Sequence, residues 1–313
     1  MQRQIKPFRG TLGDGDLAAL RDFLAIVEAG GLTAAEPLLN KSKAAISLSL
    51  TKLEQRLGMR LCERGRSGFA LTEQGQLILI AARQLFSQIN QFTDLVGATS
   101  LQISGEITVM IDDSFAFQME EPIADSIAQM NIRYPRLQLK LRMTAPDRIL
   151  NSVLDGTADL GLTALMQPNA ALVVKPLFTE EMGIFCGKGH TLFQTEDSEI
   201  SYERLKDFSF IQTSISHDAE FTAFLSGFSF LASAPTVLSR MMLILSSRYL
   251  GFLPLHFADV WVAKGSVREI RMPGSRTTNA CSVIHRKSRP LGMAAGIFKD
   301  ILVTSLQGES SAM

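Results

Sequence analysis

The chain has 313 residues, 46% of them hydrophobic, and its 31 Lys and Arg balance its 31 Asp and Glu. This length allows two or three domains, each with an apolar core. No apolar run reaches the roughly 18 residues of a membrane span, and residues 1–10 lack the apolar stretch of a signal peptide. We therefore expect a globular protein that stays in the cytoplasm and has no membrane partner.

The first 16 residues include three glycines and are predicted to form a flexible extension. Its three basic residues could reach nucleic-acid phosphates, although an ordinary mobile terminus is the simpler interpretation. From Leu17 to Ala29 apolar residues recur at helical spacing, and Gly30-Gly31 follows. This pattern predicts an amphipathic helix that ends at the glycines.

Two short helices are predicted between Leu32 and Gly58. The first would begin at Thr33, whose hydroxyl can cap the opening turn, and end near Leu39. The second would begin after Ser42, and its apolar residues recur at spacings of three and four, as in a buried stripe. The stripe consists of Ala45, Ile46, Leu50, Leu53 and Leu57.

The other face of the second helix is predicted to point mainly outward and carries small residues, hydroxyls and lysines. Small residues allow close approach to a DNA major groove, hydroxyls bond base edges or phosphates, and lysines meet phosphate or guanine. The outward residues are Ser42, Lys43, Ala44, Ser47, Ser49 and Lys52.

A basic hairpin is predicted next, with residues 60–64 and 69–71 paired around the turn at 65–68. Arg64 and Arg66 would then lie at a loop tip suited to the minor groove or the DNA backbone. Residues 32–71 hold seven Lys or Arg against three Glu, which favours a polyanion but is also common on solvated faces. If the segment binds DNA, the contacts are predicted to be Thr33, Ser42, Lys43, Ala44, Ser47, Lys52, Arg64 and Arg66.

A long helix is predicted to follow, capped by Thr72 and reaching about Val96. Apolar residues recur in it at alternating intervals of four and three, which is a heptad seam and indicates pairing with a second chain. Packing against the chain's own C-terminal domain is the alternative. The seam consists of Ile78, Ala82, Leu85, Ile89, Phe92 and Val96.

After a polar hinge at residues 97–105, short strands alternate with helices, an order that predicts a parallel sheet covered by helices. Strands are predicted at 106–111, 137–143, 160–163, 172–178, 182–187, 208–212, 251–254, 267–272 and 281–286. Helices are predicted at 121–133, 147–155, 217–225, 235–247 and 291–306.

Ligands of open parallel sheets bind beyond the carboxyl ends of the strands. Hydroxyl side chains follow four of the predicted strands, which would suit a small polar ligand such as a carboxylate, although Ser and Thr there are also routine helix caps. Asp112-Asp113 could meet an amine or a cation, but a solvated turn is the favoured interpretation. The predicted ligand-binding residues are Ser114, Phe115, Thr144, Thr163, Thr213, Ser214 and Phe252, and the two Phe have ordinary core packing as their alternative.

The whole order of motifs after Asp16 resembles the LysR-type transcriptional regulators. In the first third the matching pieces are Leu32-Thr33, Ser42 to Ser47, Leu53-Glu54, Leu57 to Leu61 and Leu71 to Gly75. In the remainder they are Tyr134 to Leu137, Leu154 to Gly156, Ala158 to Leu162, Pro176-Leu177, Gly187 to His190 and Gly251 to Pro254.

This resemblance implies an α/β multidomain protein: a winged helix-turn-helix, a linker helix that makes the dimer, and a two-subdomain effector domain like that of periplasmic binding proteins. The implied partners are promoter DNA with an interrupted inverted repeat, a small-molecule effector, and further copies of the chain in a dimer of dimers; contact with RNA polymerase is left open. The expected domains are residues 1–16, 17–71, 72–98 and 105–310, the last divided into 105–178 with 279–310, and 179–278.

Two departures from the family pattern bear on fine DNA specificity. Glu36-Pro37 stands where the family usually has small, helix-favouring residues, and a proline can shorten or kink that helix. Leu48 stands where many relatives carry a polar or basic residue.

Other function classes lack their motifs. The sequence has no Gly-x-Ser-x-Gly elbow, phosphate loop or Gly-x-Gly-x-x-Gly after a strand, which argues against an enzyme. The three cysteines and four histidines share no metal-ligand spacing, so no metal and no cofactor are expected. Each cysteine is interpreted as a small buried hydrophobe, with a redox-sensing thiol as the alternative. A periplasmic solute-binding protein is disfavoured by the winged domain.

Overall fold

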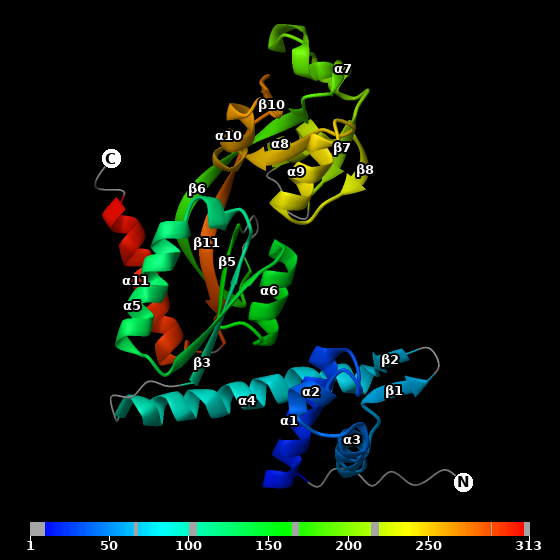
Figure 1. Ribbon diagram of the computed structural model, residues 1–313, viewed down its shortest axis with the longest axis vertical. Coiled ribbons are helices and arrows are strands. Elements are labelled where there is room, and N and C mark those ends of the chain that lie inside the picture. The colour runs from blue at the N-terminus through cyan, green and yellow to red at the C-terminus, as the bar shows by residue number, and fades with distance from the viewer. Residues whose placement is uncertain are drawn as a thin grey trace. The chain divides into compact units, whose positions relative to one another are not determined.

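The computed structural model describes residues 10–65, 68–99, 105–164, 169–213, 219–288 and 290–309. The chain forms two compact units, Met1–Asn90 and Gln91–Met313, which are described separately (Figure 1). The boundary between them lies inside the long helix that was predicted from Thr72 to about Val96. Among the described residues, no helix is both long and apolar enough to span a membrane.

The first unit is a helix-turn-helix with a two-stranded wing, as predicted. Its elements are α1 (Asp14–Ala29), α2 (Glu36–Leu39), α3 (Lys43–Leu57), β1 (Cys62–Gly65), β2 (Gly68–Leu71) and α4 (Glu73–Thr99). The strands pair antiparallel. Phe23 and Ile26 of α1 and Ile46 and Leu50 of α3 are fully buried and form the centre of its core.

The N-terminal ends of two helices differ from the prediction. α1 begins at Asp14, three residues before the predicted start, because the backbone N–H of Gly13 is bonded by the Asp16 carboxylate at 2.9 Å. α2 begins at Glu36 and not at Thr33. Pro37 lies in the first turn of α2, where a helix needs no N–H donor, so this four-residue helix accommodates it.

The hairpin and α4 are joined by close backbone contact. The Thr72 hydroxyl accepts the N–H of Gly75 at 2.9 Å and donates to the carbonyl of Arg60 at 2.7 Å, so Thr72 caps α4 as predicted. A Cβ on Gly75 would lie 1.9 Å from the Leu61 carbonyl oxygen. Only glycine therefore lets α4 start this close to the wing. The helix ends at Thr99, slightly beyond the predicted Val96.

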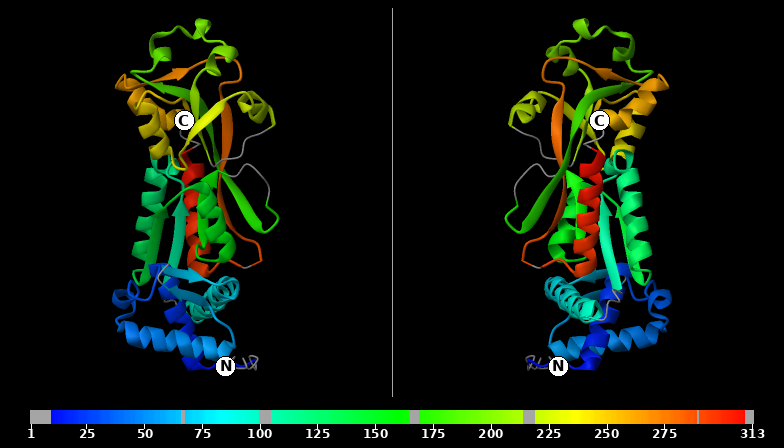
Figure 2. Two further views of the ribbon diagram at one scale, coloured as in Figure 1. Left: turned by 90° about the vertical axis from the view of Figure 1, so that its right-hand side faces the viewer. Right: turned by 90° about the vertical axis from the view of Figure 1, so that its left-hand side faces the viewer.

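The second unit begins with the predicted parallel sheet. Strands β3 (Gly105–Ile111), β4 (Leu137–Met143) and β5 (Leu160–Ala164) are parallel, with β3 in the middle. Helices α5 (Glu120–Arg133) and α11 (Met293–Glu309) pack together on one face of this sheet, and α6 (Pro146–Asp155) covers the other (Figures 1 and 2).

Two long antiparallel strands, β6 (Leu172–Gly187) and β11 (Thr277–Arg286), connect this half to a second one. The sequence predicted two strands, 172–178 and 182–187, where the structure has the single strand β6. Pro176 cannot donate to the ladder, and the register shifts opposite it, between Cys281 and Ser282. The irregularity bends the pairing without ending the strand.

The second half surrounds the far ends of these strands. Its longer elements are β7 (Ser209–Gln212), α8 (Ala219–Leu225), β8 (Ser229–Ser233), α9 (Val237–Leu245), β9 (Gly251–Pro254), α10 (Leu255–Ala263) and β10 (Val267–Ile270). Its short ones are η2 (Thr191–Gln194), η3 (Asp197–Glu199) and α7 (Tyr202–Leu205), and η1 (Phe115–Phe117) follows β3. Three of these elements, α10, β8 and α7, were not predicted from the sequence. Helix α10 follows β9 without a loop, and its largely apolar sequence has little helical periodicity.

Candidate functional site

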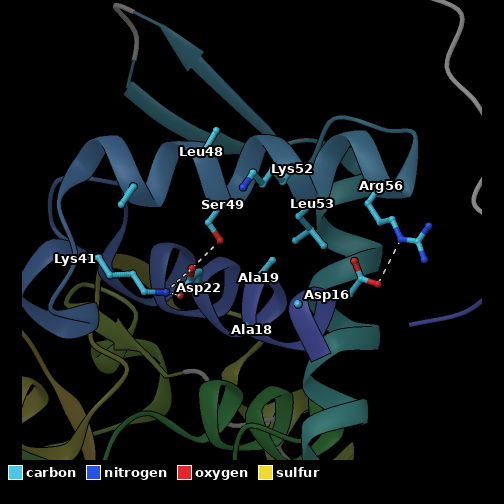
Figure 3. A pocket seen from close by; sticks show the side chains of 12 residues that line it. Asp16, Ala18, Ala19, Asp22, Lys41, Leu48, Ser49, Lys52, Leu53 and Arg56 are labelled. Atoms are coloured by element: carbon cyan, nitrogen blue, oxygen red, sulfur yellow. Dashed lines mark hydrogen bonds and ion pairs between the residues drawn. The ribbon is translucent and has the colours of Figure 1, made fainter. Parts of the chain in front are cut away.

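Helix α3 is held against α1 partly by the carboxylate of Asp22, which is 4% exposed. This carboxylate accepts hydrogen bonds from the Lys41 ammonium at 2.6 Å and from the Ser49 hydroxyl at 2.7 Å (Figure 3). Ser49 was predicted to lie on the outward side of α3, and that is wrong because its hydroxyl points at α1. The bond fixes which face of α3 is left outside.

The outside face of α3 keeps most of the predicted DNA-contacting residues. Ser42 caps the helix by accepting the N–H of Ala45 at 3.3 Å. Lys43, Ala44 and Lys52 are exposed and Ser47 is half-buried. Ala45 was predicted in the buried stripe but is exposed, because the stripe that meets α1 is narrower and begins at Ile46.

The other predicted DNA contacts lie outside α3. Thr33 is exposed in the turn before α2. Arg66 and the side chain of Arg64 lie outside the described residues, although the backbone of Arg64 pairs with Phe69 in the wing.

A groove of about 570 Å³ runs between α1 and α3 (Figure 3). Arg56, at the end of α3, donates to the carbonyl of Thr11 at 2.8 Å and contacts Asp16 at 3.4 Å. The groove is lined by Gly15, Asp16, Ala18, Ala19, Asp22, Lys41, Ala45, Leu48, Ser49, Lys52, Leu53 and Arg56. Both signs of charge occur in it, with Asp22 paired to Lys41 and Asp16 to Arg56.

The predicted seam of α4 is divided between two surroundings. Ile78, Ala82 and Leu85 pack into the core of their own unit, with Ala82 only 3% exposed. Ile89 is half-buried and Phe92 is 68% exposed. The side chain of Val96 lies outside the described residues.

In the second unit the ends of β3, β4 and β5 lie side by side. The Thr144 N–H donates to the carbonyl of Ile111 at 3.0 Å, and the Asp112 N–H donates to that of Leu162 at 2.9 Å. Of the predicted ligand-binding residues, Ser114 and Thr163 are buried and Thr144 and Thr213 are half-buried; Ser214 lies outside the described residues.

The two predicted phenylalanines lie inside apolar cores. Phe115 is fully buried and meets Phe178 edge to face, with ring centres 5.2 Å apart. Phe252 is 1% exposed and meets Phe221 in the same manner at 4.9 Å. In this conformation both rings have the core packing named as their alternative.

Asp112 and Asp113 are 3% and 6% exposed, so the interpretation of this pair as a solvated turn is wrong. The Asp113 carboxylate accepts the backbone N–H groups of Val237 at 3.0 Å and Leu238 at 2.9 Å. These are the first residues of α9, where free N–H groups and the helix dipole favour a negative charge. Asp113 thus joins the end of β3 to the second half of the unit.

Beside this contact lies a set of buried polar groups on the two connecting strands and on α9. Glu180 of β6 accepts the Asn279 amide of β11 at 2.9 Å. Arg240 of α9 is 2% exposed and donates to the Phe252 carbonyl at 2.8 Å. His256 of α10 reaches the Ser114 carbonyl at 3.4 Å.

These groups are incompletely satisfied. Among the described residues, Glu180 Oε2, Asn279 Oδ1 and Arg240 Nε are buried without a hydrogen-bond partner. Such groups are uncommon in folded proteins because each forfeits the hydrogen bonds that water would supply. Three carboxylates, of Asp112, Asp113 and Glu180, lie in this region against the Arg240 guanidinium and the His256 ring.

The pKa values of these groups shift as expected for a buried, acid-rich region. Burial, with the neighbouring Asp113 and Glu180 charges, raises the pKa of Asp112 to about 7, although the Ser114 N–H opposes the shift. Burial likewise raises the pKa of Glu180 and lowers that of Arg240. The region therefore holds protons more tightly than isolated carboxylates do.

The sequence contained a weak signal for this cluster. Arg240 is the one charged residue of α9, whose other residues are apolar except Ser239. A charge in a nearly all-apolar helix indicates a buried charge with a partner. Glu180 and Asn279 had no comparable signal, because their juxtaposition depends on the register of β6 with β11.

The cysteines behave as buried hydrophobes, as predicted. Cys62, Cys186 and Cys281 are buried and at most 2% exposed. Burial raises the pKa of Cys186 to about 11 and also raises the pKa of Cys281. Raised pKa values disfavour the thiolate and hence redox sensing at these two positions. In the described part of the chain, no three or more His, Cys, Asp or Glu are grouped so that they could hold a metal.

Replacing Asp112 by Asn should make the stability of the second unit less dependent on pH. The folded state keeps a proton on Asp112 up to a pKa of about 7, whereas the unfolded chain releases it near 4, so stability falls as pH rises between these values. Between pH 5.5 and 8, denaturant unfolding should show wild type losing roughly 2 kcal/mol relative to Asp112→Asn. The exposed control Asp125→Asn should track wild type; identical pH profiles for all three proteins would contradict the assignment.

Two family models match the chain. "Bacterial regulatory helix-turn-helix protein, lysR family" matches residues 17–76, and "LysR substrate binding domain" matches residues 101–307. The transcriptional activator BauR of Pseudomonas aeruginosa is 32% identical over 97% of this chain and all of its own length. A probable hydrogen peroxide-inducible genes activator of Mycobacterium xenopi is 27% identical over 56% of this chain and 92% of its own.

Solved structures show the same fold. A variant of full-length OxyR from Pseudomonas aeruginosa has a TM-score of 0.62 and 19% identity, covering 93% of this chain and 94% of its own. Full-length CbnR, solved in complex with its target DNA, has a TM-score of 0.60 and 17% identity, covering 92% and 99%. With both family models matched in order, the chain belongs to the LysR family of transcriptional regulators, and is not an enzyme but a DNA-binding protein controlled through a C-terminal effector domain.

Proposed function

We propose that the protein docks α3 in the major groove of promoter DNA through the face that the Asp22 bonds leave outside. The observation that carries this proposal is the composition of that face, where exposed lysines lie beside small side chains. Lys43 and Lys52 would neutralise phosphates, Ala44 would allow close approach, and the Ser42 and Ser47 hydroxyls would meet base edges or phosphates. Thr33 and the wing arginines Arg64 and Arg66 would extend the contact to neighbouring backbone and minor groove.

We further propose that two chains pair along α4. Because Ile78, Ala82 and Leu85 pack within their own unit, the face available to a second chain is shifted from the predicted seam. Among the side chains of α4 that the structure describes, the large exposed apolar ones are Leu77, Ile80 and Phe92. A two-fold dimer would present two recognition helices and so favour an interrupted inverted repeat. A dimer of dimers, located in the cytoplasm with the chromosome, completes this proposal.

The effector that we propose is a small metabolite that carries a positively charged amino group. The sequence favoured a polar ligand such as a carboxylate. However, the backbone N–H groups at the start of α9, which could bind a carboxylate ligand, already bind Asp113. The buried acceptors Glu180 Oε2 and Asn279 Oδ1 lack donors, and the carboxylates exceed the cations around them. An ammonium group would supply both the donors and the missing charge.

Lys43→Ala should weaken binding to specific and random duplexes alike and reduce the slope of log affinity against log salt by about 1, because one phosphate contact is lost. Fluorescence anisotropy at several salt concentrations measures both quantities. The control is Lys264→Ala, an exposed lysine of the second unit, which should leave affinity and slope unchanged. Equal behaviour of the two variants would contradict the proposed docking face.

The effector proposal is tested by thermal unfolding of the full chain at pH 8 with butylamine, 4-aminobutanoate and butanoate. The two amines should raise the unfolding temperature of the second unit by mass action, and butanoate should not. Glu180→Gln should abolish the rise, whereas Glu181→Gln, the exposed neighbour on β6, should retain it. Stabilisation by butanoate alone, or no stabilisation by either amine, would overturn an ammonium site at Glu180.

A further inference from the structure

Leu48 is the one large apolar side chain that α3, all of whose residues are described, leaves exposed; 56% of it is accessible. Its neighbours in the apolar stripe, Ile46 and Leu50, are fully buried against α1. Figure 3 shows Leu48 projecting from the side of α3 away from α1, while Ser49 points toward Asp22. Leu48 also borders the groove between α1 and α3, but it lies outside the apolar core of its own unit and belongs to the outside face.

A single exposed leucine is ordinary on a protein surface and needs no explanation by itself. Leu48 differs from such a residue in its neighbours on the helix. One turn before it lie Ala44 and the exposed Ala45, and one turn after it lie Thr51 and the exposed Lys52. No second bulky apolar residue of α3 extends this surface into a patch that could dock an apolar protein partner, whereas the lysines favour a polyanion.

In a DNA major groove, hydrogen-bond donors and acceptors line the base edges, and the apolar group among them is the 5-methyl of thymine. A leucine cannot bond a phosphate or a polar base edge, and placing it against one would leave that group without its water. Contact with a methyl group removes apolar surface of both partners from water. The small residues around Leu48 let the helix approach closely enough for this contact.

We propose that Leu48 is a specificity-determining residue that contacts the 5-methyl group of one thymine in each half-site of the operator. The inference rests on the proposed docking of α3 in the major groove and adds which base feature is read. It assigns the leucine a direct role in choosing the operator, beside the phosphate and hydrogen-bond contacts of Lys43 and Ser47.

The test removes the methyl group without changing any hydrogen bond. An operator is first isolated from genomic fragments that the wild-type protein retains. Each thymine of its half-sites is then replaced in turn by deoxyuridine, which lacks the 5-methyl group. Replacing the contacted thymine in one half-site should lower the affinity of the wild-type protein about fourfold, which is the effect of losing one buried methyl-sized group. The symmetry-related thymine of the other half-site should show the same loss. Deoxyuridine in place of any other thymine should leave the affinity unchanged.

The protein variants complete a double-mutant cycle. Leu48→Ala should weaken binding to the normal operator, become insensitive to deoxyuridine at that pair, and keep the wild-type salt dependence because no phosphate contact changes. Leu48→Met should keep the sensitivity. Leu38→Ala, a matched control at a leucine of α2 that is 62% exposed, should behave as wild type.

The outcomes separate the two proposals. If wild type binds and Lys43→Ala weakens binding while no thymine responds to deoxyuridine, the role of Leu48 is overturned and the docking of α3 stands. If a thymine responds equally in wild type and Leu48→Ala, the methyl group is read by another residue and the inference is wrong. If wild type retains no genomic fragment at low salt, the docking proposal and this inference fail together.

Discussion

The carboxylate of Asp22 is buried between α1 and α3, where a charge is costly unless it is paired and hydrogen-bonded. Lys41 supplies the opposite charge from the turn that links α2 and α3, and Ser49 supplies a hydroxyl from α3 itself. One group thus ties three elements and sets the rotation of α3 about its axis. That rotation determines which residues of α3, Leu48 included, can contact DNA.

In the second unit, by contrast, some of the buried charged groups are only partly hydrogen-bonded. Asp113 is satisfied at the start of α9, but Asp112, Glu180 and Arg240 lie close by with raised or lowered pKa values. Within the described residues, Glu180 Oε2, Arg240 Nε and Asn279 Oδ1 are buried without a hydrogen-bond partner. A fold that needed only stability would be better served by apolar residues here. Incomplete satisfaction at the strands that connect the two halves fits the effector site that we propose there. A ligand that completes the cluster would favour one arrangement of the halves over another.

The sequence predicted the fold class, the order of elements and the winged domain, because these follow from local patterns: helical periodicity, caps such as Ser42 and Thr72, and parallel strands alternating with helices. It failed where an outcome depends on tertiary contact. The exposure of Ala45 and the inward turn of Ser49 follow from how α1 packs on α3, which no local pattern encodes. The continuity of β6 follows from its pairing with β11.

The same difference between local patterns and tertiary contacts applies to the candidate sites. Most of the outward face of α3 could be predicted because apolar and polar residues repeat at helical spacing, and its contacts with DNA stay a prediction. The buried cluster around Asp113, Glu180 and Asn279 was not predicted, because these residues are far apart in sequence. In addition, the sequence Asp112-Asp113 resembles an ordinary polar turn. Positions after strands were identified by rule, yet Phe115 and Phe252 are seen in apolar cores, because chain position does not indicate on which side of a sheet a ring packs.

The proposed docking puts α3 in the major groove with its Asp22-bonded side turned away from DNA. Methylation interference on an operator fragment tests this docking most directly, because dimethyl sulfate places a methyl group on guanine N7, which faces the major groove. If α3 docks in this way, such methylation should block binding in two symmetry-related patches, one for each half-site. Binding that is indifferent to every N7 methyl group across the protected region would contradict it.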